Sequence, residues 1–275
     1  MSRIATRFKS LRAQGKRALI PYLTAGDPHP KATVPLMHAM VQAGANLVEL
    51  GVPFSDPMAD GPVIQAACER ALKHEISMPG VLQLVEAFRA GDEHTPVILM
   101  GYLNPVEIMG YEAFAKAAAQ AGVDGVITVD LPPEEASDWI TALAPVAIDP
   151  IFLTAPTTTI ARIEAICKAA RGFIYYVSLK GVTGAGTLDL EAVERKLAQI
   201  RACATIPIGV GFGIRDAAAA ARMAKIADAV VVGSALVERI AAHGNDLDAA
   251  KASVCALLRE MRQAMDAESA DAQVA

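Results

Sequence analysis

The chain has 275 residues, of which 53% are hydrophobic and 20% are charged. This length suits a single α/β barrel, and this apolar content allows a large core, so long disordered segments are not expected. The formal net charge of -5 argues against a nucleic-acid-binding protein, which would carry a basic face, but backbone amides could still bind a phosphorylated ligand.

The first 14 residues are basic and contain no apolar segment of the kind found in secretory signals. The apolar runs farther along the chain are short and interrupted, so no membrane-spanning helix is predicted. We therefore expect a cytoplasmic protein.

Eight short apolar segments in chain order are predicted to be strands, each followed by a helical pattern. Continuous apolar character is typical of parallel strands that are covered on both faces. Most strand starts lie about 25–35 residues apart, the length that one βα unit needs. The predicted strands are Ala18–Leu23, Leu47–Leu50, Val97–Met100, Gly125–Val129, Asp149–Leu153, Phe173–Val177, Pro207–Val210 and Ala229–Val232.

Eight such units predict a closed (β/α)8 TIM barrel, with a doubly wound open sheet as the alternative. We expect one barrel domain over residues 1–268 and a disordered tail over 269–275, where the sequence becomes polar and small.

The predicted insertions all follow the carboxyl ends of strands, which form the catalytic face of this architecture. After the second strand come a loop, 53–61, and two helices near Pro62–Lys73 and Pro79–Ala90. After the sixth strand comes the segment Ser178–Thr187, and after the eighth an extra helix near Ser234–Ile240. Excess length at these positions indicates functional loops.

Two acidic residues near the second strand are candidates for proton chemistry. Glu49 lies in an otherwise apolar strand, where apolar neighbours would favour the neutral carboxyl group and suit it to proton transfer. A solvated strand end or a buried salt bridge is the alternative for Glu49. Asp60 precedes the helix at Pro62, so a helix N-cap is its alternative.

Glycine-rich segments after strands seven and eight favour a phosphate site. Gly211 and Gly213 would allow close approach of backbone to a ligand, and the helix beginning at Ser234 would point its first N–H groups at an anion. Simple tight turns are the alternative. The segment 178–187 could close over a ligand or hold phosphate, or could be a plain flexible loop; it lacks Walker A spacing.

Large apolar side chains at the strand ends could together form a flat slot for an aromatic ring, although each one alone could be ordinary core. These residues are Tyr22, Met100, Tyr102, Ile127, Val129, Leu153 and Tyr175.

The four cysteines, Cys68, Cys167, Cys203 and Cys255, show no C-x2-C spacing. We therefore expect free thiols in a reducing compartment and no zinc or redox motif. The five histidines are scattered, and no metal site is predicted.

Five segments, 49–62, 181–185, 211–214, 21–28 and 129–135, resemble signatures of the tryptophan synthase alpha subunit family. The long first segment, Glu-Leu-Gly-Val-Pro-Phe-Ser-Asp-Pro-Met-Ala-Asp-Gly-Pro, is the most specific. The resemblance covers nearly the whole chain in order. It implies a TIM-barrel lyase that splits indole-3-glycerol phosphate into indole and glyceraldehyde 3-phosphate.

The resemblance also implies roles for individual residues. Glu49 would be the general acid and base that protonates the indole ring at C3, and Asp60 would stabilise positive charge at the indole N–H. Tyr175 would lie close to this pair, and Thr183 would position Asp60.

The remaining site residues implied by the resemblance bind the two ends of the substrate. Tyr22, Met100, Tyr102, Ile127, Tyr175 and Thr183 would bind the indole side, and Gly184, Phe212, Gly213, Gly233 and Ser234 would hold the phosphate. The family often has Phe and Leu where this chain has Tyr22 and Met100, but a large side chain is kept at both positions.

The resemblance implies a partner, the pyridoxal-phosphate beta subunit, in an α2β2 tetramer that passes indole between active sites. Contacts are expected at loops 53–60, 102–110 and 178–187, and no cofactor is expected in this chain. Two alternative functions are a non-catalytic chain that only regulates its partner, and another phosphate-binding barrel such as an isomerase or flavin enzyme.

Overall fold

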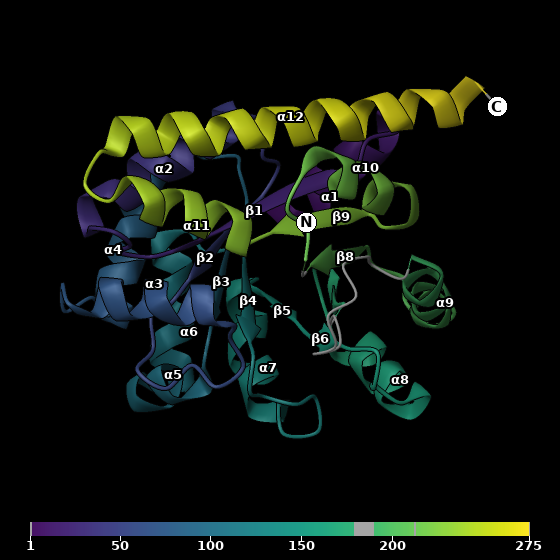
Figure 1. Cartoon of the computed structure of the whole chain (residues 1–275). Coiled ribbons are helices and arrows are strands. Elements are labelled where there is room, and N and C mark those ends of the chain that lie inside the picture. The colour runs from purple at the N-terminus through teal and green to yellow at the C-terminus, as the bar shows by residue number, and fades with distance from the viewer. Residues whose placement is uncertain (1, 179–189, 212, 275) are drawn as a thin grey trace.

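The computed structural model describes residues 2–178, 190–211 and 213–274, with side chains up to residue 268 (Figure 1). Its strands are all parallel and form one sheet in the order β5-β4-β3-β2-β1-β9-β8-β7-β6. The strands are β1 Ala18–Thr24, β2 Val48–Gly51, β3 Val97–Gly101, β4 Gly125–Thr128, β5 Asp149–Ile151, β6 Leu153–Thr154, β7 Ile174–Val177, β8 Ile208–Gly211 and β9 Ala229–Val232.

The two ends of this sheet order meet at a single residue. Only Phe152 separates β5 from β6, and at this point the chain passes from pairing with β4 to pairing with β7. The sheet therefore closes on itself, and β5 with β6 corresponds to the one strand predicted over Asp149–Leu153. The predicted (β/α)8 barrel is confirmed, and the open-sheet alternative is wrong because β5 and β6, the two ends of the sheet order, are joined through Phe152.

Helices surround the barrel, and additional ones follow β2 and β9 as the sequence predicted (Figure 1). They are α1 Arg3–Ala13, α2 Pro30–Gln42, α3 Pro62–Leu72, α4 Met78–Arg89, α5 Leu103–Met109, α6 Tyr111–Ala121, α7 Ser137–Leu143, the short 3-10 helix Ala144–Val146, α8 Ile160–Ala169, α9 Leu190–Arg201, α10 Ala217–Ile226, α11 Ser234–His243 and α12 Leu247–Val274. Over the part of the chain that the structure describes, no helix is long and apolar enough to span a membrane.

Alternation along each strand builds two apolar layers. In β1, Ala18 and Ile20 point into the barrel and join an interior cluster with Ile98 and Phe173. Leu19 and the other outward residues pack instead against the surrounding helices. Both faces of the sheet are therefore covered, which explains why the strands are continuously apolar in sequence.

The amino-terminal end of the barrel is held by a buried carboxylate. Asp124 is 4% exposed and accepts hydrogen bonds from Arg3, from Arg89 and from the backbone N–H of Val97. Arg89 also donates to the carbonyl of Thr95 at 2.6 Å. These contacts fix α1 and α4 against β3 at the end away from the strands' carboxyl termini, and they leave that other end free for chemistry.

The last helix ties the two ends of the chain together. α12 lies across α2, α10 and α11 (Figure 1). From this helix, Arg262 donates to the carbonyl of Arg17 at 2.8 Å, just before β1, and to the side chain of Asn46 at 3.2 Å, just before β2. The first and last units of the ring are thereby held together.

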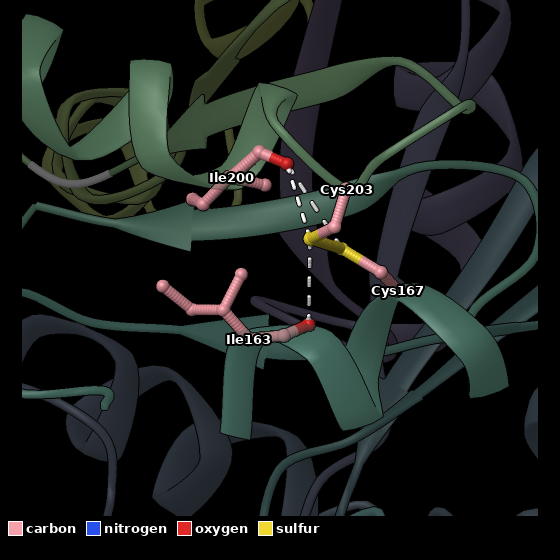
Figure 2. Close-up of a disulfide and its surroundings, with 4 residues drawn as sticks. All are labelled: Ile163, Cys167, Ile200 and Cys203. Atoms are coloured by element: carbon pink, nitrogen blue, oxygen red, sulfur yellow. Dashed lines mark hydrogen bonds between the residues drawn. A yellow bond between two sulfur atoms is a disulfide. The ribbon is translucent and has the colours of Figure 1, made fainter. Parts of the chain in front are cut away.

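The expectation of four free thiols is wrong in this structure. A disulfide joins Cys167 on α8 to Cys203, which follows α9 (Figure 2). Around the pair lie the carbonyls of Ile163 and Ile200, while Cys68 and Cys255 are free and buried. The sequence concealed the pair because Cys167 and Cys203 are 36 residues apart and meet only where α8 and α9 pack side by side.

Candidate active site

A cavity of about 850 Å³ opens at the carboxyl ends of the strands. It brings together residues that are far apart in the sequence but were predicted to share one site. The predicted site residues that line it are Tyr22, Glu49, Asp60, Met100, Tyr175, Gly213, Gly233 and Ser234. Three other predicted site residues, Thr183, Gly184 and Phe212, lie outside the described residues.

Glu49 projects from β2 into this cavity. Its side chain is 1% exposed, and its Oε2 atom has no hydrogen-bond partner among the described residues. Burial raises the pKa of Glu49 to about 8, and the charge of nearby Asp60 acts in the same direction. Both structural alternatives fail, since Glu49 is neither solvated nor in any ion pair among the described residues.

Asp60 reaches the same cavity from the loop between β2 and α3. The hydroxyl of Tyr102 donates to Asp60 Oδ2 at 3.0 Å and accepts the backbone N–H of Ala59 at 2.9 Å. Burial raises the pKa of Asp60, and the hydrogen bond from Tyr102 opposes that rise. Asp60 is not the helix cap: Gly61 occupies the N-cap position of α3, so that alternative is wrong.

Two tyrosines, Tyr22 on β1 and Tyr175 on β7, lie over glycines of the neighbouring strands. The ring of Tyr22 occupies the space where a Cβ on Gly51 would be, and Tyr175 does the same at Gly211. The Tyr22 hydroxyl also lies 3.1 Å from the hydroxyl of Thr24. Burial raises the pKa of both tyrosines well above the ordinary value, so both hydroxyl groups stay neutral.

The predicted aromatic slot is assembled only in part from the residues chosen for it. Met100, Val129 and Leu153 line the cavity together with the two tyrosines. Ile127 is 2% exposed and belongs to the interior cluster of the barrel instead of the cavity lining. Tyr102 is also absent from the lining, and its hydroxyl meets the Asp60 loop.

The other end of the cavity has the features of an anion site. Gly233 is the N-cap of α11 and Ser234 its first residue, so the positive end of the helix dipole faces the cavity. Gly213 has a φ of 76°, a conformation that a side chain would strain. Arg215 also lines the cavity and is paired with Glu238 on α11.

Sequence reasoning missed several contributors to this site, among them Arg215, the segment 131–133 and Gln65. Leu131, Pro132 and Pro133 form part of the cavity wall, although their sequence pointed only to a family resemblance. Gln65 donates from α3 to the carbonyl of Asp60 at 2.8 Å. The only signal for Gln65 was its place in the helix directly after an acidic loop. No group of three or more potential metal ligands occurs among the described residues.

The sequence matches a family model described as "Tryptophan synthase alpha chain" over residues 8–266. A tryptophan synthase alpha chain from Thioalkalivibrio sulfidiphilus is 68% identical over 266 residues, covering 97% of this chain and 100% of that protein. One from Nitrosococcus oceani is 61% identical over 267 residues, covering 97% and 98%.

Solved structures give the same result. The crystal structure of tryptophan synthase subunit alpha from Legionella pneumophila str. Paris is similar with a TM-score of 0.90 and 46% identity, covering 97% of this chain and 99% of that one. A chain in the aminoacrylate-bound crystal structure of tryptophan synthase from M. tuberculosis has a TM-score of 0.85 and 38% identity, covering 96% and 100%.

Proposed function

The chain belongs to the tryptophan synthase alpha chain family, and we propose how the residues lining its cavity divide the work of that family's reaction. It is a lyase subunit that cleaves indole-3-glycerol phosphate to indole and glyceraldehyde 3-phosphate, the alpha reaction of tryptophan biosynthesis. The observation that supports our assignment of residues is that Glu49 and Asp60 line one cavity in different electrostatic environments.

Glu49 is the general acid and base. With its pKa raised to about 8, the side chain is largely protonated near neutral pH and can donate to C3 of the indole ring. Protonation makes the ring an electron sink. Loss of the glycerol hydroxyl proton then breaks the bond between ring and glycerol chain, and the bond's electron pair restores the indole. The ionised Glu49 takes up that hydroxyl proton, so it gives one proton and regains one.

Asp60 stabilises the positive charge that forms at the indole nitrogen after C3 is protonated. The side chain is held by Tyr102 at the mouth of the cavity, and an ionised carboxylate there would accept the indole N–H. Two carboxyl groups with different surroundings thus have two roles. Burial keeps Glu49 protonated near neutral pH, whereas at Asp60 the hydrogen bond from Tyr102 opposes the rise in pKa that burial causes.

The two ends of the substrate meet different walls of the cavity. We place the indole ring between Tyr22, Met100 and Tyr175, and the phosphate at Gly213, Gly233 and Ser234, where the α11 N–H groups favour an anion. Thr183, Gly184 and Phe212 are assigned to substrate binding by family resemblance. Ile127 and Tyr102 support the site from behind its lining. The proposed steps use no metal and no cofactor in this chain.

The family implies a beta-subunit partner. We propose that this partner carries pyridoxal phosphate, that the two chains form an α2β2 tetramer in the cytoplasm, and that indole passes between them. Loops 53–60, 102–110 and 178–187 are the proposed contacts. Two large apolar side chains on the first two of these segments support this assignment, because Met58 is 81% exposed and Ile108 is 82% exposed.

The assignment of the two carboxylates is tested by assaying indole release from indole-3-glycerol phosphate. We expect slow turnover by the chain alone and faster turnover with the cognate beta subunit. Glu49→Gln should lower kcat by about 10²–10⁴-fold, the usual contribution of a general acid or base, while glycerol 3-phosphate still binds. Asp60→Asn should also lower kcat. Normal turnover by Glu49→Gln would overturn the assignment, and a wild-type chain that only stimulates its partner would support the regulatory alternative.

We also propose one domain over residues 1–268, with 269–275 as a tail into which α12 continues as far as Val274. Limited proteolysis would test this division, because a single barrel should release only short terminal peptides before the core is cut.

A further inference from the structure

We propose that Gln65 is a positioning residue for Asp60, acting through the backbone of the acidic loop. The side-chain amide of Gln65 donates to the carbonyl of Asp60 at 2.8 Å and to the carbonyl of Pro57 at 3.3 Å. The backbone N–H of Asp60 also donates to the carbonyl of Pro57 at 3.0 Å. The amide thus binds both ends of the turn that presents the Asp60 carboxylate. This inference rests on the proposed role of Asp60.

The backbone of Gln65 is held in place by α3. Its own N–H donates to the carbonyl of Gly61 at 3.0 Å in the first turn of α3. Farther along α3, Ala67 and Ala71 are fully buried, and Ala67 packs in a cluster with Tyr22. Because α3 is fixed to the barrel, the Gln65 amide transfers that fixed position to the loop in front of it.

The loop needs such a support because one face of it is open. A hollow behind the loop is lined by Phe54, Pro57, Met58 and Gln65, and none of its lining residues lines the catalytic cavity. Tyr102 holds the loop at Ala59 and at the Asp60 side chain. Gln65 is the second residue that fixes the loop, and it does so by hydrogen bonds to main-chain carbonyls on the side of the hollow.

The two hydrogen bonds from residue 65 to the loop require a side-chain N–H donor, which the amide of Gln65 supplies. Both acceptors are carbonyl oxygens, so residue 65 must offer N–H groups. Gln65→Glu keeps the length and shape of the side chain but faces two carbonyl oxygens with oxygens of its own. Gln65→Met keeps the length and removes the donor. Glu69 lies one turn farther along α3 and lines the same hollow with an exposed side chain, so Glu69→Gln is the matched control.

The experiment measures kcat and KM for indole release with the full-length chain, alone and with its cognate beta subunit. We expect Gln65→Glu and Gln65→Met to lower kcat by about tenfold or more, the scale of a 1.4 kcal/mol rise in barrier. The inhibition constant of glycerol 3-phosphate should stay within about twofold, because Gln65 is not one of the residues proposed to bind the phosphate at the start of α11. Glu69→Gln should match the wild type.

Two further readouts separate positioning from a structural role. A loosened loop exposes the Asp60 carboxylate, which lowers its pKa towards the ordinary value, so the acid limb of the kcat profile should move to lower pH. The double variant Asp60→Asn/Gln65→Glu should be no slower than Asp60→Asn alone, since both substitutions remove one function.

The outcomes distinguish the two proposals. If Asp60→Asn keeps full activity, the role of Asp60 itself is wrong. If Asp60→Asn is impaired but both Gln65 variants turn over like the wild type, the inference about Gln65 is overturned and the role of Asp60 stands. Multiplicative losses in the double variant, or a lowered melting temperature that accounts for the loss of activity, would also overturn it.

Discussion

The Glu49 carboxyl group is unfavourable for the stability of the fold but useful for proton transfer. It is 1% exposed, has an oxygen with no hydrogen-bond partner in the described part of the chain, and has a second carboxylate nearby. A structural side chain at this position of β2 would be apolar. The carboxyl group is kept where its charged form is costly, which is the condition that makes it a proton donor near neutral pH.

The raised pKa of Glu49 predicts a pH dependence of activity. The protonated form that donates to the indole ring is lost as pH rises through about 8, so kcat should fall on the alkaline side of that value. A kcat profile from about pH 6 to 10 in saturating substrate checks this. A profile that stays flat across the pKa of about 8 would contradict protonated Glu49 as the acid.

The same shift links Glu49 to stability. In the unfolded chain Glu49 titrates near the ordinary glutamate value of 4.5, and in the folded protein its pKa is about 8. Between these values the folded state binds the extra proton, so the free energy of unfolding falls as pH rises, and the loss is complete above about pH 8. Glu49→Gln should therefore resist urea better than the wild type at about pH 9 and about equally at about pH 4.

At the scale of elements, a tyrosine on one strand packs into the space left by a glycine on the neighbouring strand. A Cβ at Gly211 would overlap the Tyr175 side chain, whose ring lies across the end of β8. Gly211→Ala should therefore cost about 1–3 kcal/mol, as overpacked cores do. Adding Tyr175→Leu should recover much of that loss, which thermal unfolding of the single and double variants would measure. Equal stability of Gly211→Ala and the wild type would contradict the fit.

The link between α8 and α9 makes a prediction about thiols. In protein purified without reductant and then unfolded, two of the four cysteines should react with a thiol reagent, and all four after reduction. Closing a loop over a separation of 36 residues should stabilise the fold by about 2–4 kcal/mol, so reduction should lower the melting temperature. Four reactive thiols without reductant would contradict the bond.

Much of the architecture was predictable because parallel strands covered on both faces are continuously apolar, and their loops follow at regular intervals. It was less predictable which inward-pointing residues of a strand lie in the barrel interior and which line the cavity. Ile127 and Val129 both point inward from the same stretch, yet only Val129, nearer the carboxyl end, lines the cavity. The pairing of Cys167 with Cys203 was hidden for another reason, since it depends on how two helices pack after the barrel has closed.

The candidate site also contains some residues that could be predicted from the sequence and others that could not. Glu49 could be singled out because a carboxyl group interrupts an apolar strand, and the family resemblance located Asp60. The contacts that support Asp60 could not be found in this way, since Tyr102 comes from the end of β3 and Gln65 from α3. A hydrogen bond between separate elements leaves no periodic pattern in the sequence.

At the scale of the whole molecule, the proposed beta-subunit contact predicts that a substitution at the contact weakens association, while one elsewhere on the surface does not. Ile108 on α5 is 82% exposed, and an aspartate there should weaken association by more than about 1 kcal/mol if the side chain is buried in the complex. Titration of Ile108→Asp with the beta subunit should need more partner to reach full stimulation. Ile160→Asp, at an apolar residue 62% exposed outside the proposed contact loops, is the control. Identical titrations for both variants would contradict this surface.

The pairing of β1 with β9 has a consequence during synthesis on the ribosome. β1 leaves the exit tunnel early, but Ala229–Val232, the segment that covers one of its edges, is made only after most of the barrel. Until then the nascent chain displays an unpaired strand edge, a template on which neighbouring nascent chains can aggregate. Chaperones that recognise open sheet edges would therefore have most to protect while translation is still short of Ala229.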